Sequence, residues 1–282
     1  MSDTAAYIQA LEVSNPLLEP VIRSAIQALD LPPGSHGLDA GCGIGRQALL
    51  LAEAVGPAGH VTGLDISPAL LQHAKGIVQM AGLLHQISFQ AGDVRRLPFG
   101  DGTLDWAWSS CCVGYSAALP PVPTLQELAR VVRSGGTVAI LVWSSENLLP
   151  GYPLLEARLK ATTPGLAPFV AGSQPESHCL RALGWFRAAG LEACAARTFV
   201  GGAHAPLRSE LRQALIALLE MRWPNAEAEL TAEDRSAYRR LCRPASPDFI
   251  LDQRDYYAFF TCSMFWGQVA VAPLAIANQV GL

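Results

Sequence analysis

The chain has 282 residues, of which 50% are hydrophobic and 16% are charged, and its formal net charge is −4. This composition supplies enough apolar side chains for a packed core and excludes an intrinsically disordered chain. A mildly acidic chain without a tract of basic residues disfavours nucleic acid as a partner.

The sequence contains no long uncharged apolar run and no basic-then-apolar start, so we expect neither insertion into a membrane nor a secretory signal. The seven cysteines are odd in number and show no CxxC spacing. We therefore expect reduced thiols and a cytoplasmic protein.

Strand-like and helix-like segments alternate from residue 35 to residue 143. The predicted strands cover 36–40, 60–65, 86–91, 104–109 and 137–143, and the predicted helices between them cover 45–55, 68–81 and 124–132. This alternation predicts βαβ units and a mostly parallel sheet. A helix is also predicted over 16–29, because Asn15 is a suitable N-cap and Pro16 fits a first helical turn.

After residue 143 the pattern becomes less regular. Helices are predicted over 154–161, 175–189, 209–221 and 231–242, and strands over 191–200 and 256–272, with Gly190 ending the second of these helices. The helices between 206 and 252 have no place in a simple sheet, so we expect them to cap one end of it. The predicted organisation is an N-terminal helical segment (1–34), a sheet-forming core (35–205), a helical cap insertion (206–252) and a segment with the last strand (253–282).

The turn after the first predicted strand reads LDAGCGIG over residues 38–45. Ligands of open α/β sheets bind at this edge, and glycines let the backbone approach them closely. A dinucleotide site requires G-x-G-x-x-G, but here Arg46 stands at the third glycine position and Gly45 comes one residue early. No Lys-Ser/Thr pair follows, which excludes a P-loop. Asp39 would repel a pyrophosphate and suits a positively charged amino group.

Two further acidic residues follow the next two strands. Asp65 ends the second strand, where a carboxylate can accept from both hydroxyls of a ribose. Asp93 follows the third strand and can accept from the exocyclic amine of adenine. Ile66 offers an apolar face to the base, and the backbone N–H of Val94 can serve a ring nitrogen. Together the three carboxylates favour a ligand with an amino-acid end, a ribose and an adenine, without phosphate.

With these residues in place, the chain resembles the class I S-adenosylmethionine-dependent methyltransferases, in particular the small-molecule branch with the ubiquinone and menaquinone methyltransferases. The segments that carry the resemblance are LDAGCGIG, VTGLDIS, AGDVRRLPFGDGTLDWAWSS and ELARVVRSGGTVAILVW. The resemblance implies a Rossmann-like α/β fold: a seven-stranded, mostly parallel sheet with helices on both faces, an antiparallel last strand and a helical cap inserted before it. It also implies S-adenosyl-L-methionine as cofactor and S-adenosyl-L-homocysteine as product.

The resemblance assigns the glycine loop and the residues after the fourth strand to the methionine end, Asp65 to the ribose and Asp93 to the adenine amine. The cofactor-binding residues expected from the sequence and the resemblance are Asp39, Ala40, Gly41, Gly43, Asp65, Ile66, Gly92, Asp93, Val94, Ser109 and Ser110.

No catalytic residue is fixed by the sequence, because the cofactor supplies the electrophile and the protein mainly positions and desolvates. The candidates are Tyr115, which a packed loop tyrosine explains equally well, and His178 and His204, for which a surface histidine is the favoured interpretation. Cys111 and Cys112 would suit arsenite as an alternative acceptor, but the spacing offers no third thiolate, and no metal site is expected.

The loop of amino-group methylases, Asn/Asp-Pro-Pro-Tyr/Phe, is missing, which disfavours nucleic acid as the acceptor. We expect methyl transfer by in-line displacement to a small, partly apolar organic acceptor, because the predicted cap is mostly apolar and is followed by Phe249, Tyr256, Tyr257, Phe259 and Phe260. One alternative is a cofactor-binding regulatory or partner protein of the same fold without transferase activity. Another is a nicotinamide-dependent oxidoreductase, which requires a glycine at position 46. The acceptor atom and the oligomeric state stay open, and an oligomer is compatible with the sequence.

Overall fold

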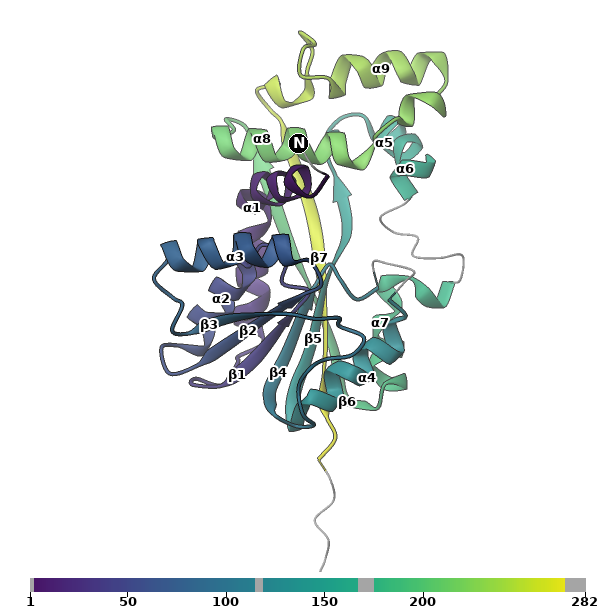
Figure 1. Ribbon diagram of the computed structural model, residues 1–282. Helices are drawn as coiled ribbons and strands as arrows, with labels where there is room; N and C mark the ends of the chain where they lie inside the picture. Colours follow the sequence, from purple (N-terminus) through teal and green to yellow (C-terminus); the bar gives the residue numbers. More distant parts are fainter. Residues whose placement is uncertain (1–2, 115–118, 167–174, 272–282) are drawn as a thin grey trace, which may run out of the picture.

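The computed structural model describes residues 3–114, 119–166 and 175–271, and in this part of the chain seven strands form one sheet (Figure 1). The strand order is β3-β2-β1-β4-β5-β7-β6. The strands are β1 His36–Ala40, β2 His60–Asp65, β3 Ile87–Ala91, β4 Leu104–Ser110, β5 Val132–Asn147, β6 Leu191–His204 and β7 Tyr257–Val269. The pairs from β3 to β5 are parallel, whereas β7 is antiparallel to β5 and to β6. The expected antiparallel last strand is therefore confirmed.

Helices cover both faces of the sheet (Figure 1). One face carries α1 Asp3–Ala28, α2 Arg46–Val55 and α3 Pro68–Met80, and the other carries α4 Pro121–Val131 and α7 Ala182–Ala188. A separate buried apolar cluster lies on each side, with Leu51 and Trp106 in one and Leu125 and Phe186 in the other. Because both faces are covered, the central strands can be apolar along nearly their whole length.

The remaining elements follow β5 and β6. They are α5 Pro153–Lys160, α6 Thr163–Leu166, η1 Pro175–Ser177, η2 Cys179–Arg181, α8 Ser209–Arg222, η3 Ala226–Ala228, α9 Ala232–Cys242 and η4 Ile250–Asp252. In Figure 1 the helices α5, α6, α8 and α9 gather at the top, where β5, β6 and β7 extend beyond the shorter strands. Since α8 and α9 lie between β6 and β7 in the chain, the helical insertion before the last strand is confirmed.

The N-terminal helix differs from its prediction. The sequence predicts a helix over 16–29 that is capped by Asn15, but α1 begins at Asp3 and passes through Pro16 and Pro20. An internal proline removes one backbone hydrogen bond and can bend a helix without ending it. The two halves of α1 run in different directions in Figure 1, as this loss of bonds explains.

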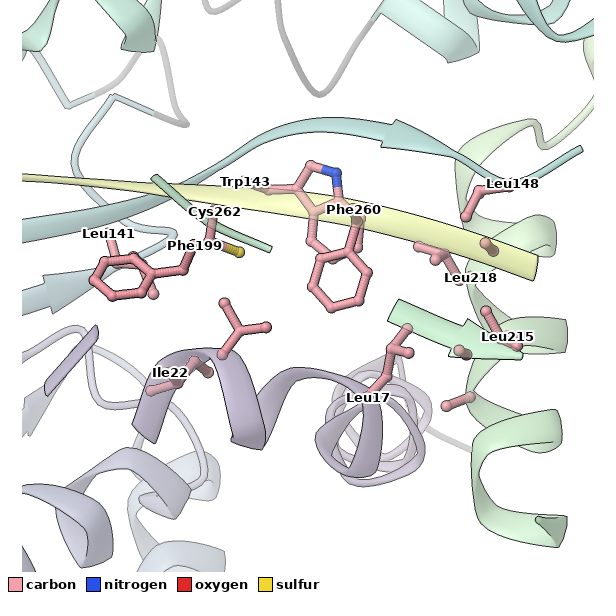
Figure 2. Packing of buried hydrophobic residues seen from close by; sticks show 14 of the residues in the cluster. Leu17, Ile22, Leu141, Trp143, Leu148, Phe199, Leu215, Leu218, Phe260 and Cys262 are labelled. Carbon is pink, nitrogen blue, oxygen red and sulfur yellow. The ribbon is translucent and has the colours of Figure 1, made fainter. Parts of the chain in front are cut away.

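A buried apolar cluster holds α1 against the long strands and α8 (Figure 2). Trp143 of β5 stacks on Phe260 of β7, with ring centroids 4.4 Å apart. Leu17 of α1 and Leu218 of α8 point into the same cluster. The burial of these side chains stabilises α1 despite its prolines.

Other differences concern the boundaries of elements. The sequence predicts one helix over 175–189, but the chain there forms η1, η2 and then α7, which ends before Gly190 in the left-handed region (φ 85°). The predicted strands over 137–143 and 191–200 are parts of the longer β5 and β6. Polar residues at the ends of β5 and β6 still pair with β7, so both strands are longer than the apolar runs from which they were predicted.

Candidate cofactor and acceptor site

Two adjoining cavities lie at the carboxyl ends of β1, β2 and β3. The first, of about 250 Å³, is bordered by the residues after β2 and after β3. The second, of about 380 Å³, lies between the loop after β1, the turn after β4 and α1. Gly41, Asp65, Cys112 and Leu119 line both cavities. This is the edge at which an open α/β sheet binds its ligand.

The loop after β1 brings the backbone close to neighbouring elements. Gly41 has φ 77°, and a Cβ atom added there would lie 2.8 Å from Sγ of Cys112. The N–H groups of Gly41 and Cys42 both donate to the carbonyl of Leu64 at the end of β2. Gly43, with φ 52°, lines the second cavity. A larger residue at Gly41 would close the space between the loop and the turn after β4.

Asp39 lies within β1, behind this loop, and is 2% exposed. No group among the described residues donates a hydrogen bond to its Oδ2 atom. Burial, and then the charge of nearby Asp65, raises the pKa of Asp39 from 3.8 to about 7. A buried carboxyl with a free oxygen suits a cationic ligand group or a water molecule bound to one.

Asp65, the last residue of β2, joins the two cavities. Its Oδ2 accepts from the N–H of Gly43 at 2.9 Å, and its Oδ1 accepts from the N–H of Ser67 at 2.9 Å. Each carboxylate oxygen keeps a further lone pair. Asp65 can therefore accept from two hydroxyls while it holds the glycine loop against α3.

An apolar slot follows Asp65 in the first cavity. Ile66 is 70% exposed, although it is a large apolar residue, and it lines this cavity together with the buried Val94. The N–H of Gly92 donates to the carbonyl of Asp65, and a Cβ atom at Gly92 would lie 2.8 Å from Leu64. The exposed apolar side chain of Ile66 is suited to pack against the face of a planar base.

Asp93 has a partner that the sequence reasoning missed. The side chain of Arg95 donates to both carboxylate oxygens of Asp93, with Nη2 to Oδ2 at 2.6 Å, and its backbone N–H also donates to Oδ1. These hydrogen bonds hold the pKa of Asp93 below its ordinary value. An adenine amine at this place would share the carboxylate with Arg95, which also lines the first cavity.

The two serines that end β4 have different surroundings. Ser110 lines the second cavity. Ser109 is buried, and its hydroxyl donates to the carbonyl of Ala40 at 2.8 Å. Ser109 and Ala40 therefore tie β4 to β1, and neither is among the described residues that line a cavity.

The candidate catalytic residues are not brought to the cavities by the described part of the structure. Tyr115 lies outside the described residues. His178 caps η2, with its Nδ1 accepting from the N–H of Leu180 at 3.2 Å. His204 is exposed at the end of β6. Neither histidine is among the described lining residues.

One face of α1 forms a wall of the second cavity, and this contribution was also missed. The residues on this face recur every three or four positions: Tyr7, Leu11, Ser14, Leu18 and Ile22. The same spacing in the sequence is the signal that could have revealed the wall. The prediction of a helix that begins only at residue 16 concealed it.

Glu12 fixes this wall to the site. One oxygen of Glu12 accepts from Nη2 of Arg46 at 2.6 Å, and the other contacts Nε2 of His73 at 2.8 Å. Ile8 and Leu11 pack beside these bonds against a small buried cluster between α2 and α3. The first half of α1 is thus attached to the helices that follow β1 and β2.

The turn after β4 carries the two adjacent cysteines. Cys111 is exposed and has φ 50°, and Cys112 is half-buried. Burial raises the pKa of the Cys112 thiol to about 11. The described residues contain no group of three or more His, Cys, Asp or Glu side chains that could hold a metal ion. Nothing in the described structure supplies the third thiolate that the arsenite alternative requires.

Residues 38–136 match the family described as Methyltransferase domain. A demethylmenaquinone methyltransferase from Bacillus cytotoxicus is 35% identical over 129 residues, which make up 45% of this chain and 52% of that protein. The chain thus spans about half the length of this relative.

Solved structures share the fold. A putative methyltransferase from Haloferax volcanii, in complex with the Trm112 methyltransferase activator, matches with a TM-score of 0.54 and 19% identity over 95% of this chain and 96% of that chain. A SAM-dependent methyltransferase from Aquifex aeolicus matches with a TM-score of 0.50 and 19% identity over 70% and 92%.

The sheet order, the glycine loop and the acidic strand ends define a class I S-adenosylmethionine-dependent methyltransferase fold. Within this fold, residues 38–136 are similar to the methyltransferase domain family and to the demethylmenaquinone methyltransferases.

Proposed function

We propose that the chain transfers a methyl group from S-adenosylmethionine to a small, partly apolar organic acceptor. The observation that carries this proposal is that Asp65 and Asp93, at the carboxyl ends of β2 and β3, line adjoining cavities beside the glycine loop, while the buried Asp39 lies behind this loop in β1. Asp39, Asp65 and Asp93 suit, in this order, the ammonium group, the ribose hydroxyls and the adenine amine of the cofactor.

When bound, S-adenosylmethionine supplies a methyl group on a positively charged sulfur, which is the electrophile of the reaction. The residues of the chain bind, orient and exclude water. Asp65 would accept hydrogen bonds from the ribose hydroxyls, the backbone of the glycine loop would hold the methionine end, and Ile66 would offer an apolar contact to the base. Holding the acceptor in line with the methyl group contributes about 7–11 kcal/mol.

The second cavity supports an apolar acceptor. Its walls include Leu18 and Ile22 of α1, Leu141 of β5 and Cys262 of β7. Arg46 also borders it, but its charge is matched by Glu12. A neutral, apolar molecule fits this lining better than an anionic one. The relatives named demethylmenaquinone methyltransferase agree with such an acceptor.

The thiol of Cys112 and the phenol of Tyr7, which line the second cavity, are suited to donate hydrogen bonds rather than to abstract a proton. Burial raises the pKa of Cys112 to about 11, and the pKa of Tyr7 is raised above its ordinary value. At neutral pH both groups are protonated and can donate to an acceptor.

A turnover assay tests the proposal. The purified chain is incubated with S-adenosylmethionine and a panel of apolar quinols, phenols and amines, and the release of S-adenosylhomocysteine is measured. The proposal predicts turnover of at least one panel member, and loss of this turnover in Asp65→Ala. Binding of the cofactor without turnover of any member would favour the alternative, a regulatory or partner protein of the same fold.

A further inference from the structure

Tyr7 occupies a distinct position on the α1 wall. It is the one aromatic residue among the described residues that line the second cavity, and the residue is 56% exposed. Leu11, one turn further along α1, is fixed by packing against the cluster of Ile44 and Leu70, and Glu12 is fixed by Arg46. The position of Tyr7 at the cavity is therefore set by neighbours on its own helix.

Tyr7 lines the same cavity as residues from two parts of the proposed cofactor site. It lines the second cavity together with Asp65 at the end of β2 and with Ser110, Cys111 and Cys112 at the end of β4 and in the turn that follows. Partial burial, and then the charges of Asp65, Cys111 and Cys112, raises the pKa of Tyr7. The phenol thus lies near the ribose carboxylate and also near the turn after β4.

The covalent structure of the cofactor places its sulfur between the ribose and the amino-acid end, the groups proposed to bind near Asp65 and near the turn after β4. The sulfur joins the 5′ carbon of the ribose to the methionine chain, so it lies between the group held by Asp65 and the amino-acid end. A positive charge within about 6 Å of an aromatic ring is attracted to the face of the ring. S-adenosylhomocysteine has a neutral thioether at the same place and lacks this attraction.

We propose that Tyr7 is a specificity-determining residue whose ring contacts the cationic sulfur and favours the methylated cofactor over its demethylated product. The inference rests on the proposed function. The ring selects for charge, whereas Asp65 and Asp93 bind parts of the nucleoside that substrate and product share. Tyr7 thereby weakens product binding relative to cofactor binding.

The test compares the dissociation constants of S-adenosylmethionine and S-adenosylhomocysteine by calorimetry in the wild type, Tyr7→Leu and Tyr7→Phe. Tyr7→Leu should weaken binding of the sulfonium by about 3- to 10-fold while binding of the thioether changes by less than about twofold. Tyr7→Phe keeps the ring and should keep the wild-type ratio. Tyr257→Leu, which removes an exposed aromatic residue that lines neither cavity, is the matched control.

Equal weakening of both ligands by Tyr7→Leu would overturn the inference and leave the proposed function intact. A Tyr7→Phe protein that behaves like Tyr7→Leu would also overturn it, because the ring would then not be the determinant. A wild-type protein that binds neither ligand would instead refute the proposed function. Thermal unfolding of each variant shows that the compared proteins are folded.

Discussion

Asp39 is a buried acid whose charge has no cationic partner among the described residues. Its pKa of about 7 in the folded chain lies above the ordinary value of 3.8. Between these values the folded protein binds the proton more tightly than the unfolded chain does. The free energy of unfolding therefore falls as the pH rises from about 4 to about 7, and it stays lower at higher pH.

Replacing Asp39 by Asn should remove this pH dependence. Without ligand, Asp39→Asn should be more stable than the wild type at pH 8 by a few kcal/mol, on the order of 1.4 kcal/mol for each unit of raised pKa, and similar to it at pH 4. Urea unfolding at both pH values measures the difference. If the free energy of unfolding depended on pH in the same way in both proteins, ionisation of Asp39 would not destabilise the folded chain.

Asp65 holds the glycine loop and is the proposed ribose acceptor, so Asp65→Ala should reduce affinity for S-adenosylhomocysteine by about 1 kcal/mol or more. Asp105→Ala is a matched control, because Asp105 also accepts a backbone N–H, that of His36, but at the opposite end of β1. Calorimetry of the three proteins decides the matter. Unchanged affinity in Asp65→Ala, or an equal loss in both variants, would contradict the assigned site.

At the scale of elements, the contacts of α1 explain why it forms part of the site. Glu12 is the residue that connects its first half to both α2 and α3. Burial raises the pKa of Glu12, but the hydrogen bonds from His73 and Arg46 outweigh this and lower it overall. The ionised form is thus the one that the folded protein prefers.

Glu12→Gln should loosen the first half of α1. We expect faster amide hydrogen exchange before residue 15 and a loss of ligand affinity of roughly 1 kcal/mol, because two charged hydrogen bonds are weakened. Glu19→Gln removes a carboxylate that pairs with Arg23 on the same helix and serves as the control. Exchange that is equally slow in Glu12→Gln and in the wild type would show that packing alone holds α1.

The sequence predicted correctly those strands whose boundaries are marked by neighbouring residues in the chain. The bounds predicted for β1 and β2 agree with the structure, because short apolar runs end there at glycine or acidic residues. The predicted fifth strand was too short, since the polar end of β5 continues only through pairing with β7, as with Glu146 opposite Phe260. A pairing between residues so far apart leaves no local pattern in the chain.

In the candidate site, too, some features could be predicted from the sequence and others could not. The three acidic residues could be proposed from the sequence, because each lies within two residues of the end of a predicted strand. The bidentate contact of Arg95 on Asp93, the burial of Ser109 and the wall formed by α1 depend on side-chain directions and on tertiary packing. These features required the three-dimensional structure.

At the scale of the molecule, the region from 206 to 252 is less separable than a cap insertion suggests. Leu215 and Leu218 of α8 belong to the buried cluster that also contains Leu17 of α1 (Figure 2). Arg222 at the end of α8 donates to Glu146 of β5 at 2.7 Å, and both side chains are buried. The boundaries at 206 and 252 remain a prediction, but removal of this region would expose core residues of α1 and β5.

Arg222→Met should therefore destabilise the whole chain by about 3–5 kcal/mol, because Glu146 would be left buried without its cation. Glu146→Gln combined with Arg222→Met should recover part of this loss. Denaturant unfolding measures both effects. A single variant as stable as the wild type would show that α8 is not coupled to the sheet through this pair.

Across the described chain, no helix combines the length and the apolar character that crossing a membrane requires. The methyltransferase match covers residues 38–136, whereas the wall of the second cavity also uses α1 and β7. The second cavity, which we propose receives the acceptor, is thus lined in part by residues outside the matched segment.

Titration of the purified chain with S-adenosylmethionine, S-adenosylhomocysteine and NAD⁺ by calorimetry is the most direct test of the central claim. The three carboxylates at the strand ends predict saturable binding of both S-adenosyl nucleosides and no comparable affinity for the dinucleotide. Absence of binding to either nucleoside, or a preference for NAD⁺, would contradict the account.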